Sequence, residues 1–542
     1  MTSLVHELIA HSARLTPDAE ALVYQAQRLS YAQLQQQVSG FAHALLAAGT
    51  GRGERVAVYL EKRIETVISL FGASAAGAVF VPVNPLLKPD QLAYIVNDCS
   101  VSVLVTSADR LAALAPLLEA SMSGAGPAGL FSSLHTVIVV GSKPGAVLAW
   151  QGSPSCKLLL WEACLLSKVD KQAHRCIDGD VAAILYTSGS TGRPKGVVLS
   201  HRNLLAGAHS VVQYLNNTAQ DRILAVLPLS FDYGLSQLTT AFLSGATVVL
   251  INYLLPRDVV TLVSEERITG LAAVPPLWIQ LAQQKWPADC SLRYLTNSGG
   301  AMQRPTLQAL RTALPAAQVY LMYGLTEAFR STYLPPAQLD TRPDSMGKAI
   351  PNAEILVLRP DGSPCAPGEA GELVHRGTLV ALGYWNDVQK TAERFRPLPQ
   401  QPGGLPFAEI AVWSGDTVRM DEEGYLYFIG REDDMIKVSG YRISPTEVEE
   451  VIYSFPDVEE LAAVGVPHPQ LGQAIVAVVR QNGSASLNAD TLRKECQRRL
   501  PSYMVPAHIQ IDADALPRNP NGKIDRKALQ QRFANQFDIP PT

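Results

Sequence analysis

A loop rich in glycine and hydroxyl residues, set between apolar segments, is the feature that most constrains this 542-residue chain. The apolar run from Val181 to Leu185 predicts a buried strand, and an amphipathic helix is expected after Ser200. Between them lie hydroxyl residues, glycines and a lysine: Thr187, Ser188, Gly189, Ser190, Thr191, Gly192, Lys195 and Gly196. Glycines let the backbone bend until several N–H groups point inward, so this loop predicts a polyphosphate-binding site.

Two other interpretations of the loop are weaker. A flexible Ser/Gly linker has a similar composition, but Pro194-Lys195-Gly196 next to apolar strands is not typical of linkers. The pattern Gly-x4-Gly-Lys-Ser/Thr of motor and kinase proteins is not matched either, because Arg193-Pro194 follows Gly192. The loop is therefore predicted to bind phosphate through a motif other than Gly-x4-Gly-Lys-Ser/Thr.

Composition narrows the class of protein. The chain is 47% hydrophobic and too long for one ordinary domain, and its net charge of −4 gives no basic field for nucleic acid. Seven cysteines show no Cys-x2-Cys pair, which suits reduced thiols. Charged and histidine residues interrupt Met1 to Arg14, so this is not a signal peptide, and no apolar run reaches the ~18 residues of a membrane span. We expect a cytoplasmic protein with no membrane association.

Alternating strand and helix patterns predict an α/β fold. A helical pattern runs from Leu29 to Leu45, a strand from Arg55 to Leu60, and a second helix from Thr66 to Ala78. Strand, helix and strand in succession favour a parallel sheet covered by helices. Residues 121–180 are irregular in composition, and we predict a surface connection there without assigning it a function.

The loop from Tyr186 to Gly196 resembles the phosphate loop of the adenylate-forming superfamily, which includes acyl-CoA synthetases, amino-acid adenylating enzymes and luciferases. Motifs from about residue 29 to residue 527 follow that family's order. The resemblance implies an N-terminal adenylation core, residues 1–432, with parallel-rich sheets and helices that hold ATP and the acyl group. It also implies a small mobile α+β C-terminal domain, residues 433–542, with its hinge at Asp433.

The resemblance also implies a nucleotide and metal site. Residues of three motifs are expected to hold adenine, phosphate, ribose and Mg²⁺: Ser298, Gly299, Gly300, Tyr323, Thr326, Glu327, Asp416 and Arg431. Their chemistry suits these roles, since Tyr323 offers an aromatic face to adenine and Glu327 a hard oxygen ligand to Mg²⁺. Asp416 has two acceptor oxygens for the ribose hydroxyls. We expect ATP and Mg²⁺ to be required, with Thr326 and Glu327 among the catalytic residues.

Lys523 lies on a turn formed by Asn521-Gly522 and matches the family's adenylation lysine. An ammonium group between the substrate carboxylate and the α-phosphate would offset their repulsion and orient the attack. Out of context, an exposed turn lysine is the ordinary interpretation of Asn-Gly-Lys. Lys437 is a second lysine near the hinge, for which a solvated strand position is the favoured interpretation.

Asp232 is the residue that bears most on the substrate. A buried carboxylate must be paired or protonated, and amino-acid adenylating enzymes place an aspartate in a matching Ser-Phe-Asp context on the substrate ammonium group. A capped or solvent-facing aspartate at a loop is the alternative. By resemblance, the acyl pocket is lined by Asp232, Tyr233, Ser236, Ala273, Thr296, Ser298, Met322 and Arg330. Arg330 would bind an acidic substrate group or pair with Glu327, and the second is favoured.

These motifs predict an AMP-forming acid–thiol ligase. A carboxylate substrate attacks ATP·Mg²⁺ to give an acyl-adenylate, and a pantetheine thiol then takes the acyl group and releases AMP. The chain resembles stand-alone prolyl carrier-protein ligases and also exosortase-associated AMP-forming acyl-CoA ligases. We expect a small amino acid such as L-proline as the substrate and a separate carrier protein as the acceptor, because the fifteen residues after Lys527 hold no carrier domain.

Three alternatives remain at this point. An acyl-CoA ligase would use coenzyme A and a carboxylate that is not an amino acid. A luciferase-like oxygenase would use the same adenylate with O₂, and a non-catalytic relic would be expected to lack Lys523 or Glu327, both of which are present. A monomer or weak dimer is expected.

Overall fold

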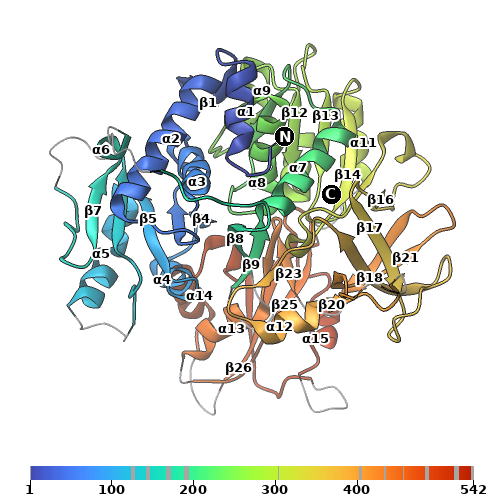
Figure 1. Ribbon diagram of the computed structural model, residues 1–542. Coiled ribbons are helices and arrows are strands. Elements are labelled where there is room, and N and C mark those ends of the chain that lie inside the picture. The colour runs from blue at the N-terminus through green and yellow to red at the C-terminus, as the bar shows by residue number, and fades with distance from the viewer. Residues whose placement is uncertain are drawn as a thin grey trace.

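In the residues that it describes, the computed structural model contains four β-sheets with helices packed on and between them (Figure 1). It describes residues 2–123, 129–141, 147–165, 172–187, 194–302, 304–401, 404, 406–431, 435–455, 457–481, 487–517 and 524–538. The α/β class predicted from the sequence is confirmed, because parallel strands dominate the two largest sheets.

The first large sheet is mainly parallel, with antiparallel strands at its edges. In spatial order it consists of β16 (Lys348–Ala349), β15 (Thr332–Leu334), β14 (Gln318–Tyr323), β13 (Tyr294–Asn297), β12 (Gly270–Ala273), β10 (Arg222–Ala225), β11 (Thr247–Leu250), β1 (Glu20–Tyr24) and β2 (Gln27–Ser30). Strands β11, β12 and β13 are buried along their whole length, as parallel strands covered on both faces are.

The second large sheet has the same character and carries the predicted phosphate loop. Its spatial order is β19 (Gly383–Tyr384), β9 (Lys195–Ser200), β8 (Val181–Thr187), β4 (Val79–Pro82), β3 (Arg55–Tyr59), β5 (Val101–Ser107), β6 (Thr136–Val140) and β7 (Lys157–Leu160). Strand β9 runs antiparallel to β8, so the loop between them is the end of a hairpin.

Helices between the two large sheets join them into one core. They are α1 (Glu7–Leu15), α2 (Tyr31–Ala48), α3 (Ile64–Ala76), α7 (His201–Leu215) and α8 (Asp232–Ser244). Helix α3 contacts β4 of one sheet and β1 of the other, and α8 packs on β10 and β11. One cluster of buried apolar side chains therefore runs through both sheets.

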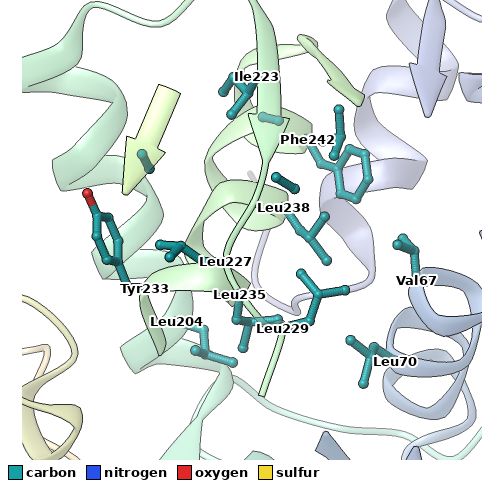
Figure 2. Packing of buried hydrophobic residues seen from close by; sticks show 14 of the residues in the cluster. Val67, Leu70, Leu204, Ile223, Leu227, Leu229, Tyr233, Leu235, Leu238 and Phe242 are labelled. Carbon is teal, nitrogen blue, oxygen red and sulfur yellow. The ribbon is translucent and has the colours of Figure 1, made fainter. Parts of the chain in front are cut away.

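Helix α8 divides its side chains between this core and the candidate site. In Figure 2, Leu238 and Phe242 lie on the side of α8 nearer Val67 and Leu70 of α3. Tyr233 lies on the opposite side, where its hydroxyl points away from that packing. The apolar face of α8 thus anchors the helix, and its first turn is left to line the site.

Further helices cover the outer faces of the sheets. They are α4 (Pro89–Asp98), α5 (Ala108–Met122), α9 (Pro256–Glu265), α10 (Pro275–Ala282) and α11 (Arg304–Ala313). Helix α6 (Trp161–Leu165) instead packs on α2, β6 and β7. The prediction of a plain surface connection over 121–180 is wrong in part, because β6, β7 and α6 fall there. All five residues of β6 are buried in the parallel sheet, although glycine- and proline-rich segments on either side mask its short apolar run in the sequence.

A third sheet is antiparallel and follows the first two in the chain. It consists of β17 (Ala353–Leu358), β18 (Ala370–Gly377), β21 (Ile410–Met420) and β20 (Phe395–Pro397), with β22 (Leu426–Arg431) also paired to β21. A turn at Asp421-Glu-Glu-Gly424 joins β21 to β22 as a hairpin. Helix α12 (Val388–Arg394) lies against β19 and β20.

The fourth sheet is built only from strands after residue 435 and lies in the lower part of Figure 1. Its strands are β24 (Tyr441–Ile443), β23 (Ile436–Val438), β26 (Gly472–Gln481) and β25 (Val458–His468), with β27 (His508–Asp512) parallel to β26. Helices α13 (Pro445–Tyr453), α14 (Ala489–Arg499) and α15 (Arg526–Arg532) pack on it. The long strands β25 and β26 pair with each other.

The part of the chain that the structure describes contains no helix both long and apolar enough to cross a membrane.

Candidate functional site

The stems of the predicted phosphate loop are well defined. Thr187, the last residue of β8, is the register partner of Lys195, the first residue of β9. Gly196 follows, and a Cβ there would lie 2.7 Å from Cγ2 of Ile184, so only glycine fits. The loop residues Ser188, Gly189, Ser190, Thr191 and Gly192 lie outside the described residues.

Lys195 has an unusual environment for a surface-loop lysine. Its Nζ lies 5.2 Å from the ring centroid of Tyr384 in β19. Burial, reinforced by the nearby positive charge of Lys390, lowers the pKa of Lys195 to about 8. The side chain is therefore a poorly solvated cation, which favours an anionic ligand.

Glu327 lies in the short 3-10 helix η1 (Thr326–Ala328), which follows β14. The hydroxyl of Tyr384 donates a hydrogen bond of 2.7 Å to Oε1 of Glu327. Burial raises the pKa of this carboxyl, but the charges of Arg442 and Arg394 and the Tyr384 hydroxyl outweigh burial and lower it overall. Glu327 is therefore ionised at neutral pH and can act as a metal ligand.

No cluster of three or more potential metal ligands occurs in the described parts of the chain. The single carboxylate of Glu327 can still serve Mg²⁺, because this ion usually takes one or two carboxylates and completes its shell with water and substrate phosphates. The residues present therefore fit a Mg²⁺ ion that binds together with ATP.

The residues predicted to hold adenosine converge on one place. The hydroxyl of Tyr323, at the end of β14, donates a 2.5 Å hydrogen bond to Oδ2 of Asp416 in β21. Asp416 is buried and is the register partner of Arg431 in β22. Ser298 and Gly299 follow β13, and Gly299 has φ of +81°, a conformation that glycine adopts at little cost. Gly300 comes next in the same turn.

Some of the predicted acyl-pocket residues lie at or near the carboxyl ends of neighbouring parallel strands. Ala273 ends β12, Thr296 lies near the end of β13, and Met322 lies near the end of β14. In open parallel sheets, ligands bind at this edge. The buried hydroxyl of Tyr214 approaches Sδ of Met322 at 3.1 Å.

Asp232 begins helix α8; it does not end a strand, since β10 ends at Ala225. Burial raises the pKa of Asp232, and the positive charge of Arg330 only partly offsets this. Among the described residues Asp232 has no ion pair within 4.0 Å. The residue is half-buried, and a carboxylate without such a partner is available to a cationic ligand.

Arg330 does not make the contact that we favoured from the sequence. Instead of pairing with Glu327, its Nη2 donates a 2.7 Å hydrogen bond to Oγ of Ser236. Its guanidinium carbon lies 4.2 Å from the ring centroid of Tyr233. The expected pairing fails because Glu327 faces Tyr384 and the chain turns sharply between the two residues, where Phe329 has φ of +55°.

The hairpin of β23 and β24 reaches this site from the C-terminal sheet. The ring of Tyr441 lies 4.9 Å from that of Phe231, which precedes Asp232. A Cβ on Gly440 would lie 2.9 Å from Val274, so glycine allows this close approach. Arg442 is near enough to lower the pKa of Glu327.

Other sequence-based expectations for the C-terminal part have mixed outcomes. Lys437 lies in β23, where its Nζ is 5.5 Å from the ring of Phe428, outside the acyl pocket. Asp433 and Lys523 lie outside the described residues, as does the side chain of Arg431. Their roles remain predictions.

A small pocket beside Glu327 is lined by residues of the N-terminal part of the chain and by Arg442 of the C-terminal sheet. It is lined by Leu325, Glu327, Arg394, Val412, Trp413, Ser414 and Arg442.

Comparison with models of known protein families identifies the family of this chain. Residues 9–385 match the model described as AMP-binding enzyme, and residues 447–523 match the model described as the C-terminal domain of that enzyme. The chain belongs to the AMP-binding enzyme family.

Relatives of this AMP-binding enzyme include both kinds of ligase predicted from the sequence. An L-proline–[L-prolyl-carrier protein] ligase from Pseudomonas fluorescens is 31% identical over 98% of this chain and 99% of its own length. A long-chain-fatty-acid–CoA ligase from Salmonella typhimurium is 30% identical over 98% of this chain and 95% of its own. A linear gramicidin synthase polypeptide from Brevibacillus parabrevis is 31% identical over 97% of this chain, which spans 10% of that relative's length.

Solved structures support the same fold. An o-succinylbenzoate CoA synthetase from Bacillus subtilis, bound to a product analogue, superposes with a TM-score of 0.80 at 26% identity. The match covers 97% of this chain and 98% of that one. The prediction of an adenylate-forming ligase is thereby confirmed for the family, while the substrate is not determined by these comparisons.

Two residues of the AMP-binding enzyme site were missed from the sequence. Tyr384, which the sequence did not single out as a site residue, contacts both Glu327 and Lys195. Arg442 follows Gly440-Tyr441 in the hinge-like segment, where nothing local indicates that it approaches Glu327. The proximity of Tyr384 to a phosphate loop follows from β19 pairing with β9, which the sequence pattern does not reveal.

Proposed function

We propose that this chain activates the carboxylate of an amino acid with ATP and passes the acyl group to the phosphopantetheine thiol of a separate carrier protein. In the first step a carboxylate oxygen attacks the α-phosphorus, which forms the acyl-adenylate and releases pyrophosphate. In the second step the thiol sulfur attacks the acyl carbon, AMP leaves, and the thiol proton is lost to solvent. L-proline, the substrate named for one relative, is the first candidate from the comparisons.

The observation that carries the amino-acid part of this proposal is the environment of Asp232. Its carboxylate lies at the first turn of α8, next to Tyr233 of the pocket and without an ion pair among the described residues. An ammonium group on the substrate would supply the missing partner and restore an ionised, paired carboxylate. A fatty acid would leave it unpaired.

The chain's own residues have distinct proposed roles in adenylation. Tyr323 and Asp416 orient the adenosine, and Lys195 binds phosphate oxygens, as a poorly solvated ammonium favours. Glu327, held by Tyr384, would ligate Mg²⁺, which supplies charge neutralisation on the phosphates. Lys523 is proposed to bridge the substrate carboxylate and the α-phosphate.

The C-terminal part is proposed to rotate between the two steps about Asp433. The β23–β24 hairpin contacts residues next to the proposed acyl site, Tyr441 with Phe231 and Gly440 with Val274, which supports this proposal. This docked position suits the thiol-transfer step, in which the hairpin would help to guide the thiol to the adenylate. A second position would bring Lys523 to the same pocket.

Exchange of pyrophosphate into ATP tests the substrate class. Purified protein is assayed with single amino acids and with fatty acids, in the wild type and in Asp232→Asn. We expect exchange with at least one amino acid and a loss of about 100-fold in the variant, because its amide cannot pair with ammonium. Exchange with fatty acids alone would overturn the proposal.

The role of Lys523 is tested separately for the two steps. In Lys523→Ala we expect adenylate formation to be lost, whereas transfer from a supplied acyl-adenylate to a pantetheine thiol continues. Equal loss of both steps would contradict the assigned role. Lys527→Ala, four residues further along, serves as a control for the loss of a nearby positive charge.

An acyl-CoA ligase that acts on an uncharged acid is the second candidate. One observation favours it: the raised pKa of Asp232 shows that burial favours its neutral form, and a neutral carboxyl group needs no cation. A relative of this kind matches over 95% of its length. Coenzyme A and a carrier protein compared as acceptors would separate the two candidates.

A further inference from the structure

Arg330 is a buried cation whose side chain is only partly satisfied. Only 2% of the residue is exposed, and its Nε is buried without a hydrogen-bond partner among the described residues. The side chain has one hydrogen bond there, from Nη2 to Oγ of Ser236. A guanidinium carries five N–H donors, so most of its binding capacity is unused.

No protein carboxylate in the described part of the chain lies within 4.0 Å of this guanidinium. Asp232 is near enough for Arg330 to lower its pKa, but the two form no ion pair. Glu327 is held by Tyr384 and faces Arg442. Burying an unpaired charge is strongly unfavourable, so a residue like Arg330 is expected to have a partner that the folded chain does not supply.

The surroundings hold Arg330 in one orientation. Its guanidinium lies 4.2 Å from the ring centroid of Tyr233, and the Tyr233 hydroxyl is fixed by a 2.7 Å hydrogen bond with Oγ1 of Thr296. Ser236 donates its hydroxyl proton to the carbonyl oxygen of Tyr233, which leaves the Ser236 oxygen to accept from Arg330. A cation fixed in this way is preorganised for a planar anion, which a guanidinium binds through two parallel N–H groups.

The charges of the pocket specify what the substrate must carry. Adenylation turns the reacting carboxylate into an uncharged mixed anhydride, so that group does not compensate Arg330. An amino acid with an uncharged side chain would add one ammonium beside Asp232 and leave Arg330 without an anion. A second carboxylate on the substrate would pair Arg330 and make the filled pocket neutral.

We infer that Arg330 binds a second carboxylate of the substrate, and that the acid activated by this chain is an amino dicarboxylic acid. The amino part rests on the proposed function and on Asp232, whereas the second carboxylate rests on Arg330 alone. Under this inference L-proline is a poorer substrate than L-aspartate or L-glutamate, because its ring leaves the guanidinium unpaired.

The test compares substrates in the wild type and in Arg330→Met, which keeps a long apolar side chain over Tyr233. Pyrophosphate exchange is measured with L-aspartate, L-glutamate, succinate, glutarate, L-proline and L-leucine. We expect the wild type to prefer the amino dicarboxylic acids. In the variant kcat/KM for them should fall about 100-fold, mainly through KM, while that for L-leucine is equal or higher.

Arg293→Met is a matched control. Arg293 also lies over a tyrosine ring, 4.9 Å from that of Tyr294, but it is paired with Asp221 at 2.9 Å. Its loss should lower thermal stability without changing the order of substrates. The rise in melting temperature caused by ATP reports whether each variant is folded, and the rise caused by L-aspartate reports binding without turnover.

The outcomes separate this inference from the proposed function. Preference for succinate or glutarate over the amino acids, lost in Arg330→Met, would support the second carboxylate and overturn the ammonium site. Preference for L-proline or L-leucine in the wild type would overturn the inference and leave amino-acid activation standing. An equal loss for all substrates in a folded Arg330→Met, as in a purely structural role, would also overturn it.

Discussion

The phenol of Tyr384 donates a 2.7 Å hydrogen bond to Oε1 of Glu327, 57 residues away in the sequence. The same ring lies 5.2 Å from Nζ of Lys195. Tyr384 therefore links the carboxylate proposed to hold Mg²⁺ with the lysine at the stem of the phosphate loop. The strand pair β19–β9 creates this link, since it fixes Tyr384 opposite Val197.

The Tyr384→Phe variant tests the hydrogen bond and keeps the ring over Lys195. Without the hydroxyl, the Glu327 carboxylate loses a group that orients it and favours its ionised form. We expect the Mg²⁺ concentration for half-maximal pyrophosphate exchange to rise about tenfold, as for other residues that orient a metal ligand. An unchanged Mg²⁺ dependence would show that Glu327 does not need this contact.

The lowered pKa of Lys195 predicts a pH dependence of ATP binding. With a pKa of about 8, set by burial and the charge of Lys390, the amine is largely neutral at pH 9. If the charged form binds phosphate, the KM for ATP should rise about tenfold between pH 7 and pH 9. Lys195→Arg should abolish this rise, because arginine stays protonated. The same rise in both proteins would assign the effect to another group.

Glu447 predicts a pH dependence of stability in the C-terminal part. Its Oε2 is buried without a partner among the described residues, and burial, with a smaller effect of Glu450, raises its pKa to about 8. Because the folded protein holds this proton more tightly than the unfolded chain, stability present at pH 4.5 is lost as the pH rises through 8.

In Glu447→Gln this loss should disappear. At pH 9 we expect the variant to be more stable than the wild type by about 1 to 3 kcal/mol in the unfolding of the C-terminal part. Calorimetric melting between pH 5 and pH 9 measures the difference. If the melting temperatures of the two proteins changed with pH in the same way, Glu447 would be solvated in solution.

The contact between Tyr441 and Phe231 predicts a separation of the two half-reactions. Tyr441 also stacks on Tyr503 at 3.7 Å, and Tyr503 accepts a 3.4 Å hydrogen bond from Asn84, so this aromatic group joins the C-terminal sheet to the large sheets. Tyr441→Ala should slow thioester formation up to about tenfold and leave pyrophosphate exchange nearly unchanged. Equal effects on both steps would indicate general destabilisation.

The elements predicted with success are those whose signals are local. The hairpin stems around the phosphate loop follow from continuous apolar runs, and α7 begins at His201 because Ser200 and Asn203 cap it reciprocally. The strand β6 was missed, since the short apolar run from Val137 to Val140, between glycine- and proline-rich segments, has no periodicity to distinguish it from a loop.

The failures at the site concern contacts between distant segments. Spacing of three residues favoured a pair between Glu327 and Arg330, as on a helix. The chain instead leaves the 3-10 helix at Phe329 with positive φ, which turns Arg330 toward Ser236, 94 residues away in the sequence. Local spacing could not predict this contact, because the positive φ of one residue, Phe329, changes the direction in which the Arg330 side chain points.

The sequence by itself determined the family, the α/β class and the chemical types gathered in the motifs, because glycine loops, apolar runs and short motifs act over neighbouring residues. Only the tertiary structure decided which groups are partnered. It joined Tyr384 to Glu327 and Tyr323 to Asp416, and it left Arg330 buried without a carboxylate among the described residues. Pairing and burial of charged groups depend on the packing of segments far apart in the chain. Whether a charged side chain is available to a ligand is therefore decided by the fold and not by the local sequence.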